Sequence, residues 1–177
     1  ISTSDGPFES IDWVMDHALE GDSIIIHPGH YDSGFSNWGK SAHLSGNSGN
    51  PDDVWIHEEI EFSGGNSSMH MLSVHNDAGN GISVTAGSIH ISYVLVDSVS
   101  GEAIALRNTA DASISNVTLY GNGYALVDSS SGSVSVVNSI AWGNTNTVTG
   151  DPVITHSNVQ GGYTGTGNIN VDPLFTN

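Results

Sequence analysis

The chain has 177 residues, enough for one domain with a sizeable core, and it contains 22 glycines and no cysteine, which excludes disulfides and zinc–thiolate sites. The 19 acidic residues stand against only Lys40 and Arg107, so the formal net charge is −17. We therefore expect no binding to nucleic acid or to anionic membrane surfaces, because both need lysine and arginine at phosphate groups.

Membrane and export segments are not visible either. No run approaches the ~20 apolar residues that cross a bilayer, so no membrane insertion is expected. No basic and apolar signal segment opens the chain, so the segment is either cytosolic or already processed.

The first predicted element is a helix over residues 8–20. Apolar residues recur there at helical spacing, at Ile11, Val14, Met15, Ala18 and Leu19. Gly21 follows as a C-terminal stop. Residues 23–27 then predict a buried strand, and Pro28-Gly29 predicts a turn.

The next segment is less regular. Residues 35–50 are rich in Gly, Ser and Asn and contain Trp38, so they predict a long loop at the side of the molecule. Loops of this kind shape the binding face of many solenoids. The sequon Asn66-Ser67-Ser68 makes Asn66 a candidate glycosylation site.

The second half of the chain repeats about every 22 residues. Residues 101–106 align with 123–127, and residues 91–96 align with 114–119 at a shift of 23. The clearest repeats lie between 79 and 162. Short β-type runs punctuated by Gly, Asn and Ser at this period are typical of one turn of a solenoid.

The repeat also predicts what each coil places above its neighbour. Apolar residues such as Ile91 and Ile114 should stack inside, about 4.8 Å apart along the axis. Asn116, Asn138 and Asn158 should form an inward asparagine ladder at a tight turn. Gly121 and Gly143 fit turn positions that need a positive φ.

Taken together, the short helix, the strand and the turn Pro28-Gly29-His30-Tyr31 resemble the entry of right-handed parallel β-helix proteins of the pectate-lyase-like superfamily. Residues 44–57 resemble the step into the second coil of that family, and residues 154–175 resemble the last coil of its secreted bacterial members. The resemblance implies one all-β right-handed parallel β-helix over residues 1–177, with the helix covering the first coil. It also implies an extracellular or cell-surface location.

No comparable cap is visible at the C-terminus. An uncapped final coil exposes unpaired backbone groups and apolar side chains, which favours pairing with another edge. The sequence therefore predicts a fragment of a longer protein, or a subunit on which neighbouring copies stack.

Catalytic residues are hard to assign. The lyases of this superfamily usually use Lys or Arg as the base, but Lys40 and Arg107 have no evident partner, and the acidic surface would repel uronate polymers. A hydrolase needs two carboxylates within about 5–10 Å of each other. The acidic residues of the repeats fall at different phases of the coil: Asp97, Glu102, Asp111 and Asp128.

Three histidines end apolar strands, namely His27, His57 and His75. If those strands stack, the imidazoles form a column with His30 nearby, which could hold a divalent metal ion. The alternative is that each histidine ends its strand and faces solvent or a loop carbonyl.

Two aromatic residues, Tyr120 and Trp142, occupy the same repeat position and should face outward above Asp97. Stacked exposed rings make a platform for sugar faces, and Trp38 or Trp55 could extend it. The alternative is that a C-terminal segment or a neighbouring subunit covers the rings.

These features predict a non-catalytic extracellular module that builds a surface structure or filament, or that binds a polysaccharide or other glycan. The alternative is a polysaccharide-degrading enzyme, either a glycoside hydrolase or a lyase. A third hypothesis, an ice-binding face, comes from the small outward pairs Ser92/Ser115 and Ser113/Ser135.

Overall fold

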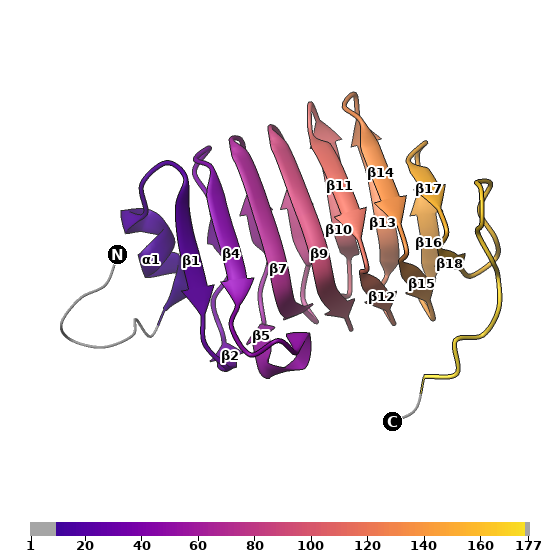
Figure 1. Cartoon of the computed structure of the whole chain (residues 1–177), viewed down its shortest axis with the longest axis horizontal. Coiled ribbons are helices and arrows are strands. Elements are labelled where there is room, and N and C mark those ends of the chain that lie inside the picture. The colour runs from indigo at the N-terminus through magenta and orange to yellow at the C-terminus, as the bar shows by residue number, and fades with distance from the viewer. Residues whose placement is uncertain (1–9, 176–177) are drawn as a thin grey trace.

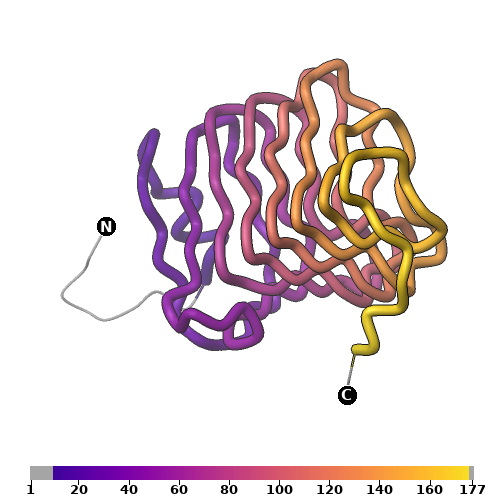
Figure 2. Tube along the Cα trace, turned by 45° about the vertical axis from the view of Figure 1, so that its right-hand side comes forward, coloured from indigo at the N-terminus to yellow at the C-terminus, as the bar shows by residue number. Residues whose placement is uncertain are grey.

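The structure is a computed structural model that describes residues 10–175. The chain winds into a parallel β-solenoid of about six turns, with coils of about 22 residues and one short helix near its N-terminus (Figure 1). The predicted β-helix fold is therefore confirmed. Figure 2 shows the coils stacked side by side from the N-terminal to the C-terminal end.

The helical elements lie in the first third of the described chain. Helix α1 spans Ile11–His17, and the short 3-10 helix η1 spans Pro51–Asp53. The strands are β1 (Asp22–Ile26), β2 (Gly29–Tyr31), β3 (Phe35–Ser36), β4 (Ala42–Gly46), β5 (Val54–Ile56), β6 (Ile60–Phe62), β7 (Asn66–His75), β8 (Ile82–Val84), β9 (Ser88–Asp97), β10 (Glu102–Asn108), β11 (Asp111–Ser115), β12 (Thr118–Tyr120), β13 (Tyr124–Ser130), β14 (Val134–Val137), β15 (Ile140–Trp142), β16 (Asn146–Thr149), β17 (Val153–Thr155) and β18 (Asn158–Val159).

The strands form two parallel sheets. The second sheet has 6 strands in the order β16-β13-β10-β8-β6-β3. The first sheet has 12 strands and follows the order β1-β4-β7-β9-β11-β14-β17, with β2, β5, β12, β15 and β18 continuing the same coils. Strands β7 and β9 run through the full width of the first sheet, whereas the other coils cross it as two shorter strands.

A column of left-handed residues divides the first sheet into an upstream and a downstream half. Their φ angles lie between 50° and 55°, at Met71, Tyr93, Asn116, Asn138 and His156. Asparagine tolerates this conformation better than most residues. The repeated asparagines therefore mark a bend in the sheet and do not fill the core.

The predicted inward ladder of Asn116, Asn138 and Asn158 is consequently wrong. Asn138 is exposed and Asn116 is half-buried. Asn158 does not share their column, because it pairs with Ile140 on the neighbouring coil.

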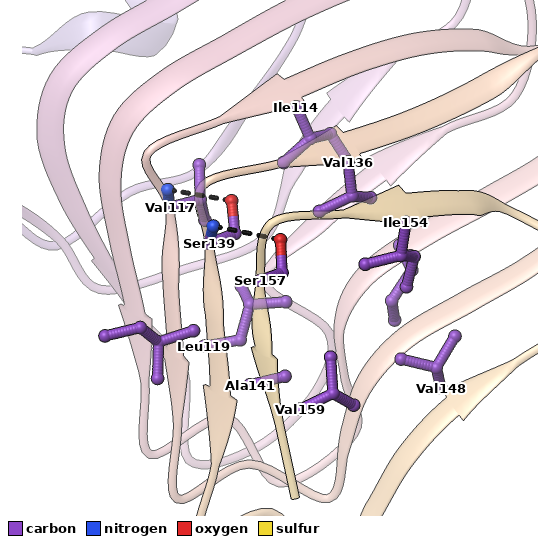
Figure 3. Close-up of a pocket in the computed structure, with 12 residues that line it drawn as sticks. Ile114, Val117, Leu119, Val136, Ser139, Ala141, Val148, Ile154, Ser157 and Val159 are labelled. Carbon is purple, nitrogen blue, oxygen red and sulfur yellow. Dashed lines mark hydrogen bonds between the residues drawn. The ribbon is translucent and has the colours of Figure 1, made fainter. Parts of the chain in front are cut away.

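A different pair forms the ladder. Asn122 and Asn144 are buried, and the Asn122 Nδ2 donates to the Asn144 Oδ1 at 2.9 Å. The Asn144 Nδ2 donates in turn to the Leu119 carbonyl at 2.9 Å. Each amide follows a positive-φ glycine, Gly121 or Gly143, as the turn prediction required. Ser139 and Ser157 make a second ladder, in which each hydroxyl accepts a backbone N–H from the coil before it (Figure 3).

Apolar side chains stack between the sheets as predicted. Ile91 lies over Ile114 at a shift of 23, and Ile114 lies over Val136 at a shift of 22. Complete burial of such a side chain contributes roughly 1.5–3 kcal/mol, so the column stabilises every coil through its neighbours.

The predicted loop over residues 35–50 is wrong, because residues 35–46 belong to a regular coil. Phe35 in β3 and Ala42 and Leu44 in β4 are buried in the core. The real excursion is shorter and covers residues 47–53, including η1.

Helix α1 closes the N-terminal end, as predicted, over Ile11–His17 within the expected 8–20; residues 8 and 9 lie outside the described range. Ile11, Met15 and Ala18 are buried against the first coil. The Ser10 hydroxyl accepts the Trp13 N–H at 3.3 Å, which satisfies one of the free donors at the helix start.

The final coil is not bare, so the prediction of an uncapped end is wrong for the first sheet. Residues 160–175 fold back along β17 and β18 (Figure 1). The Val159 N–H donates to the Ile169 carbonyl at 3.0 Å, and the His156 N–H donates to the Thr166 carbonyl at 2.8 Å. Inside these last coils a small apolar cavity of about 20 Å³ remains, lined by residues that include Leu119, Val148 and Val159 (Figure 3).

Candidate functional site

One outward column crosses successive coils at the end of the downstream half of the first sheet. Each member follows the last buried residue of its strand, so its side chain lies on the outer surface. We call this column the outer row; its members are His57, His75, Asp97, Tyr120, Trp142 and Gln160. Neighbouring members lie about one strand spacing apart, near 4.8 Å. The row therefore presents six side chains in a line along the axis of the solenoid.

The N-terminal part of the row is a cluster of rings. The rings of His57 and His75 lie 5.6 Å apart, and the rings of His30 and His57 stack at 5.1 Å. The Nδ1 of His30 lies 2.8 Å from the Nε2 of His57, so one imidazole donates to the other. The Trp55 ring stacks with the rings of His30 and His57, with ring centroids 6.3 Å apart in each pair.

The middle of the row is a histidine between two carboxylates. The Nδ1 of His75 lies 3.6 Å from the Asp97 Oδ1, and its Nε2 lies 3.6 Å from the Asp77 Oδ1. The Asp97 Oδ1 is buried and has no hydrogen-bond partner within the described residues. The other oxygen of Asp97 accepts only a long bond of 3.4 Å from the Ser98 hydroxyl. This carboxylate therefore keeps unused capacity to attract a positive group.

The C-terminal part of the row is the predicted aromatic pair. Tyr120 pairs in register with Trp142 on one side and with Asp97 on the other, as the repeat predicted. Phe175 from the C-terminal segment packs edge-on against Tyr120, with ring centroids 5.0 Å apart. Tyr120 nevertheless keeps 43% of its surface exposed. The C-terminal segment thus covers part of Tyr120, as the second alternative of the sequence analysis proposed, and the binding of sugars by this pair stays a prediction.

Trp38 does not belong to this platform. Its Nε1 donates to the Asp16 Oδ1 at 2.9 Å, so it lies beside α1 at the N-terminal end. Trp55, the other predicted extension, does join the row through its contacts with His57 and His75. Sequence spacing alone does not show which of the two tryptophans lies beside the row, because it does not reveal the path of the chain over residues 35–50.

The three histidines predicted as metal ligands do not converge. His57 and His75 lie on neighbouring coils as expected, with their rings edge-on to each other, but His27 lies in the turn after β1, where its Nδ1 is 3.2 Å from the Asn47 Nδ2. His30 takes its place beside His57. Between residues 10 and 175, no group of three or more His, Cys, Asp or Glu side chains could hold a metal ion.

The two cationic side chains have structural partners that the sequence did not reveal. The Lys40 Nζ donates to the carbonyls of Met15, Asp16 and Ala18, so it caps the C-terminal end of α1. Arg107 forms an ion pair with Glu102 on the same strand. Neither cation is part of the outer row.

The remaining candidates lie elsewhere. Asn66 is exposed at the start of β7, where its Oδ1 accepts the Ser88 hydroxyl at 2.6 Å, and its glycosylation stays a prediction. The serine pairs Ser92/Ser115 and Ser113/Ser135 are in register on the upstream half. Histidines interrupt both columns, since His70 pairs with Ser92 and His90 pairs with Ser113.

Comparison of the chain with protein-family models, with curated proteins and with solved structures gave no match. Among residues 10–175, no helix is long and apolar enough to cross a membrane.

Proposed function

We propose that the chain is a non-catalytic carbohydrate-binding module, and that an extended glycan lies along the outer row. The observation that carries the proposal is the continuous register from His57 through His75, Asp97 and Tyr120 to Trp142. A row of rings and polar groups parallel to the solenoid axis offers a linear polymer one contact per coil.

The chemistry of the row fits a sugar polymer. Tyrosine and tryptophan rings bury the apolar face of a pyranose while their polar tips stay wet. Asp77 and Asp97 offer acceptors for sugar hydroxyls, and the histidine nitrogens offer donors or acceptors. Tyr120 is exposed and Trp142 is half-buried, so a polymer could reach both rings from solvent without opening the fold.

Membership of the pectate-lyase-like superfamily and an extracellular or cell-surface location are further parts of the proposal. The parallel coils and the entry helix support the first. The location rests on the acidic composition and on the resemblance to secreted members. A role in assembly has less support, because residues 160–175 occupy the edge on which another copy would stack.

Binding to a panel of immobilised polysaccharides tests the function. We expect Trp142→Ala and Tyr120→Ala each to weaken binding roughly tenfold, because each variant removes an aromatic ring on which a sugar unit would stack. Trp38→Ala is the matched control, since it removes an exposed tryptophan outside the row. Equal losses in all three variants, or no binding by the native chain to any polysaccharide, would refute the proposal.

A second candidate is a polysaccharide-degrading enzyme, favoured by His75 between Asp77 and Asp97. A histidine with a buried carboxylate oxygen 3.6 Å from one ring nitrogen is an arrangement that could serve general acid–base catalysis. Incubation with the same panel, followed by measurement of new reducing ends and of unsaturated products, tests it. Turnover by the native chain and its loss in His75→Gln would establish the enzyme.

A further inference from the structure

We infer that the glycan bound by the outer row is cationic, a polysaccharide with free amino groups such as a β-linked glucosamine polymer. The inference rests on the proposed function and names the class of ligand. It is carried by the sign of the charges along the row and by the pairing of ring faces with carboxylates.

The charges around the row are negative at neutral pH. Asp97 lies within it and Asp77 borders it, at 3.6 Å from the two nitrogens of His75. The η1 loop adds Asp52 and Asp53 beside Trp55, whose Nε1 donates to the Asp52 carbonyl at 2.6 Å. The positive side chains Lys40 and Arg107 are engaged elsewhere, with the end of α1 and with Glu102. The row itself holds no lysine or arginine, so a uronate polymer would meet repulsion from its carboxylates.

Asp97 places one of these negative charges at a defined position within the outer row. Its Oδ1 has no hydrogen-bond partner in the described chain, and its side chain is still 22% exposed. It lies in register between His75 and Tyr120. An ammonium group bound over Tyr120 would therefore lie one coil spacing from the Asp97 carboxylate, whose Oδ1 has the His75 Nδ1 at 3.6 Å but no hydrogen bond.

The aromatic rings favour the same charge. The face of a tyrosine or tryptophan ring is negative and attracts an ammonium group within about 6 Å of its centre. Tyr120 and Trp142 thus contribute both a surface for the sugar ring and an attraction for its amino group. A neutral glycan would make only the contact between its sugar ring and the aromatic face. An amino-sugar polymer would also gain the attraction between its ammonium group and that face.

The test compares hexamers of different charge, three of them β-linked and one, the galacturonate hexamer, α-linked. Titration calorimetry and the tryptophan fluorescence of the whole chain are followed with glucosamine, N-acetylglucosamine and glucose hexamers, and with a galacturonate hexamer, at pH 6. We expect the glucosamine hexamer to bind roughly tenfold or more tightly than the neutral ones and to weaken as salt is raised. The galacturonate hexamer should not bind.

Two variants locate the effect. Asp97→Asn and Asp77→Asn should each weaken binding of the glucosamine hexamer several-fold more than binding of the neutral hexamers, because asparagine keeps an acceptor oxygen for a hydroxyl and removes only the charge. The side chain of Asp77 is 90% exposed, so this variant keeps the test valid if Asp97→Asn does not fold. Asp151→Asn is the matched control, because it removes the same charge from an exposed position outside the row.

The outcomes separate the two proposals. If the neutral hexamers bind as tightly as the glucosamine hexamer, the inference of a cationic ligand is refuted and the proposal of glycan binding stands. If no hexamer and no polysaccharide binds, both proposals are refuted. Binding of oligolysine with equal affinity, unaffected by Trp142→Ala, would show that charge alone is recognised and would also overturn the inference.

Discussion

The two ends of the solenoid are closed in different ways. At the N-terminal end, Ile11 and Met15 of helix α1 and Ala18 directly after it are buried in the core, each at most 4% exposed. At the C-terminal end, residues 160–175 bond to the backbone of the last coil, but Ile169 and Val171 stay 54% and 61% exposed. The apolar cavity also lies at this end.

The difference separates two tasks of a cap. A solenoid end must satisfy the free backbone groups of the last strand and must also keep water from the apolar interior. Helix α1 performs the second task with side chains, whereas the C-terminal segment performs mainly the first with hydrogen bonds. We expect the N-terminal end to carry more of the stability and the C-terminal end to tolerate change.

The largest expected effect comes from removing the main side chain of the N-terminal cap. Met15→Ala should lower the free energy of unfolding by about 2–5 kcal/mol, because it leaves a cavity against the first coil. Chemical denaturation measures the loss. Ile169→Ala at the other end should cost less than about 1 kcal/mol, and equal losses would contradict the contrast between the ends.

The next effect concerns how α1 is held. Lys40→Met keeps the length of the side chain but removes its bonds to three helix carbonyls, so we expect a loss of about 1–2 kcal/mol. Arg107→Met removes a partly exposed ion pair with Glu102 and should cost at most about 1 kcal/mol. Thermal and denaturant unfolding of both variants measures the difference; a larger loss for Arg107→Met would contradict it.

The C-terminal end should accept a larger side chain. Val148→Ile adds one methylene where the small cavity lies, and we expect a gain of about 0.5–1 kcal/mol. Val84→Ile adds the same group at a fully buried position and should instead destabilise the chain. A loss of stability in Val148→Ile would show that this end is as tightly packed as the rest.

The C-terminal segment also touches the outer row. Phe175→Ala removes the ring that packs on Tyr120, so it should leave unfolding nearly unchanged and raise glycan affinity by a few-fold. Titration with the best-binding hexamer measures the change. Weaker binding in this variant would mean that Phe175 is part of the platform and does not compete for it.

The smallest effect is a dependence on pH at the N-terminal end. The Ser41 hydroxyl and N–H bond to Glu20 and hold the pKa of its carboxyl below the ordinary 4.5. A lowered pKa stabilises the folded chain above pH 4.5, and the contribution disappears as the pH falls through the folded pKa. The stability difference between the native chain and Glu20→Gln should therefore shrink on acidification, as unfolding curves at pH 7 and pH 3 would show; a constant difference would refute the role of Glu20.

Much of the fold could be predicted because neighbouring coils repeat the same chemistry. The shift of 22 residues predicts that Ile114 pairs with Val136 and Tyr120 with Trp142, and the structure confirms both pairs. The predicted ladder of Asn116, Asn138 and Asn158 is wrong because asparagine suits both a left-handed bend and an inward ladder. Asn116 takes the first role and Asn122 the second, and only the burial of each distinguishes them.

The outer row could be predicted only in its C-terminal part. Tyr120 and Trp142 lie where the repeat is regular, so their register followed from the sequence. The contacts of His30 and Trp55 depend on the first coils, where the Gly- and Ser-rich composition of residues 35–50 concealed the buried alternation of Phe35, Ala42 and Leu44. The unpartnered oxygen of Asp97 depends on side-chain geometry that no pattern encodes.

The coil-by-coil register has a mechanical consequence. Because each coil bonds only to the coils on either side, tension applied at the C-terminus would act on one interface at a time. Each coil that peels away would release about 22 residues, roughly 75 Å of extended chain. A glycan bound across several coils would hold these coils together. The force needed to detach the last coils would therefore rise with the number of coils that the ligand spans.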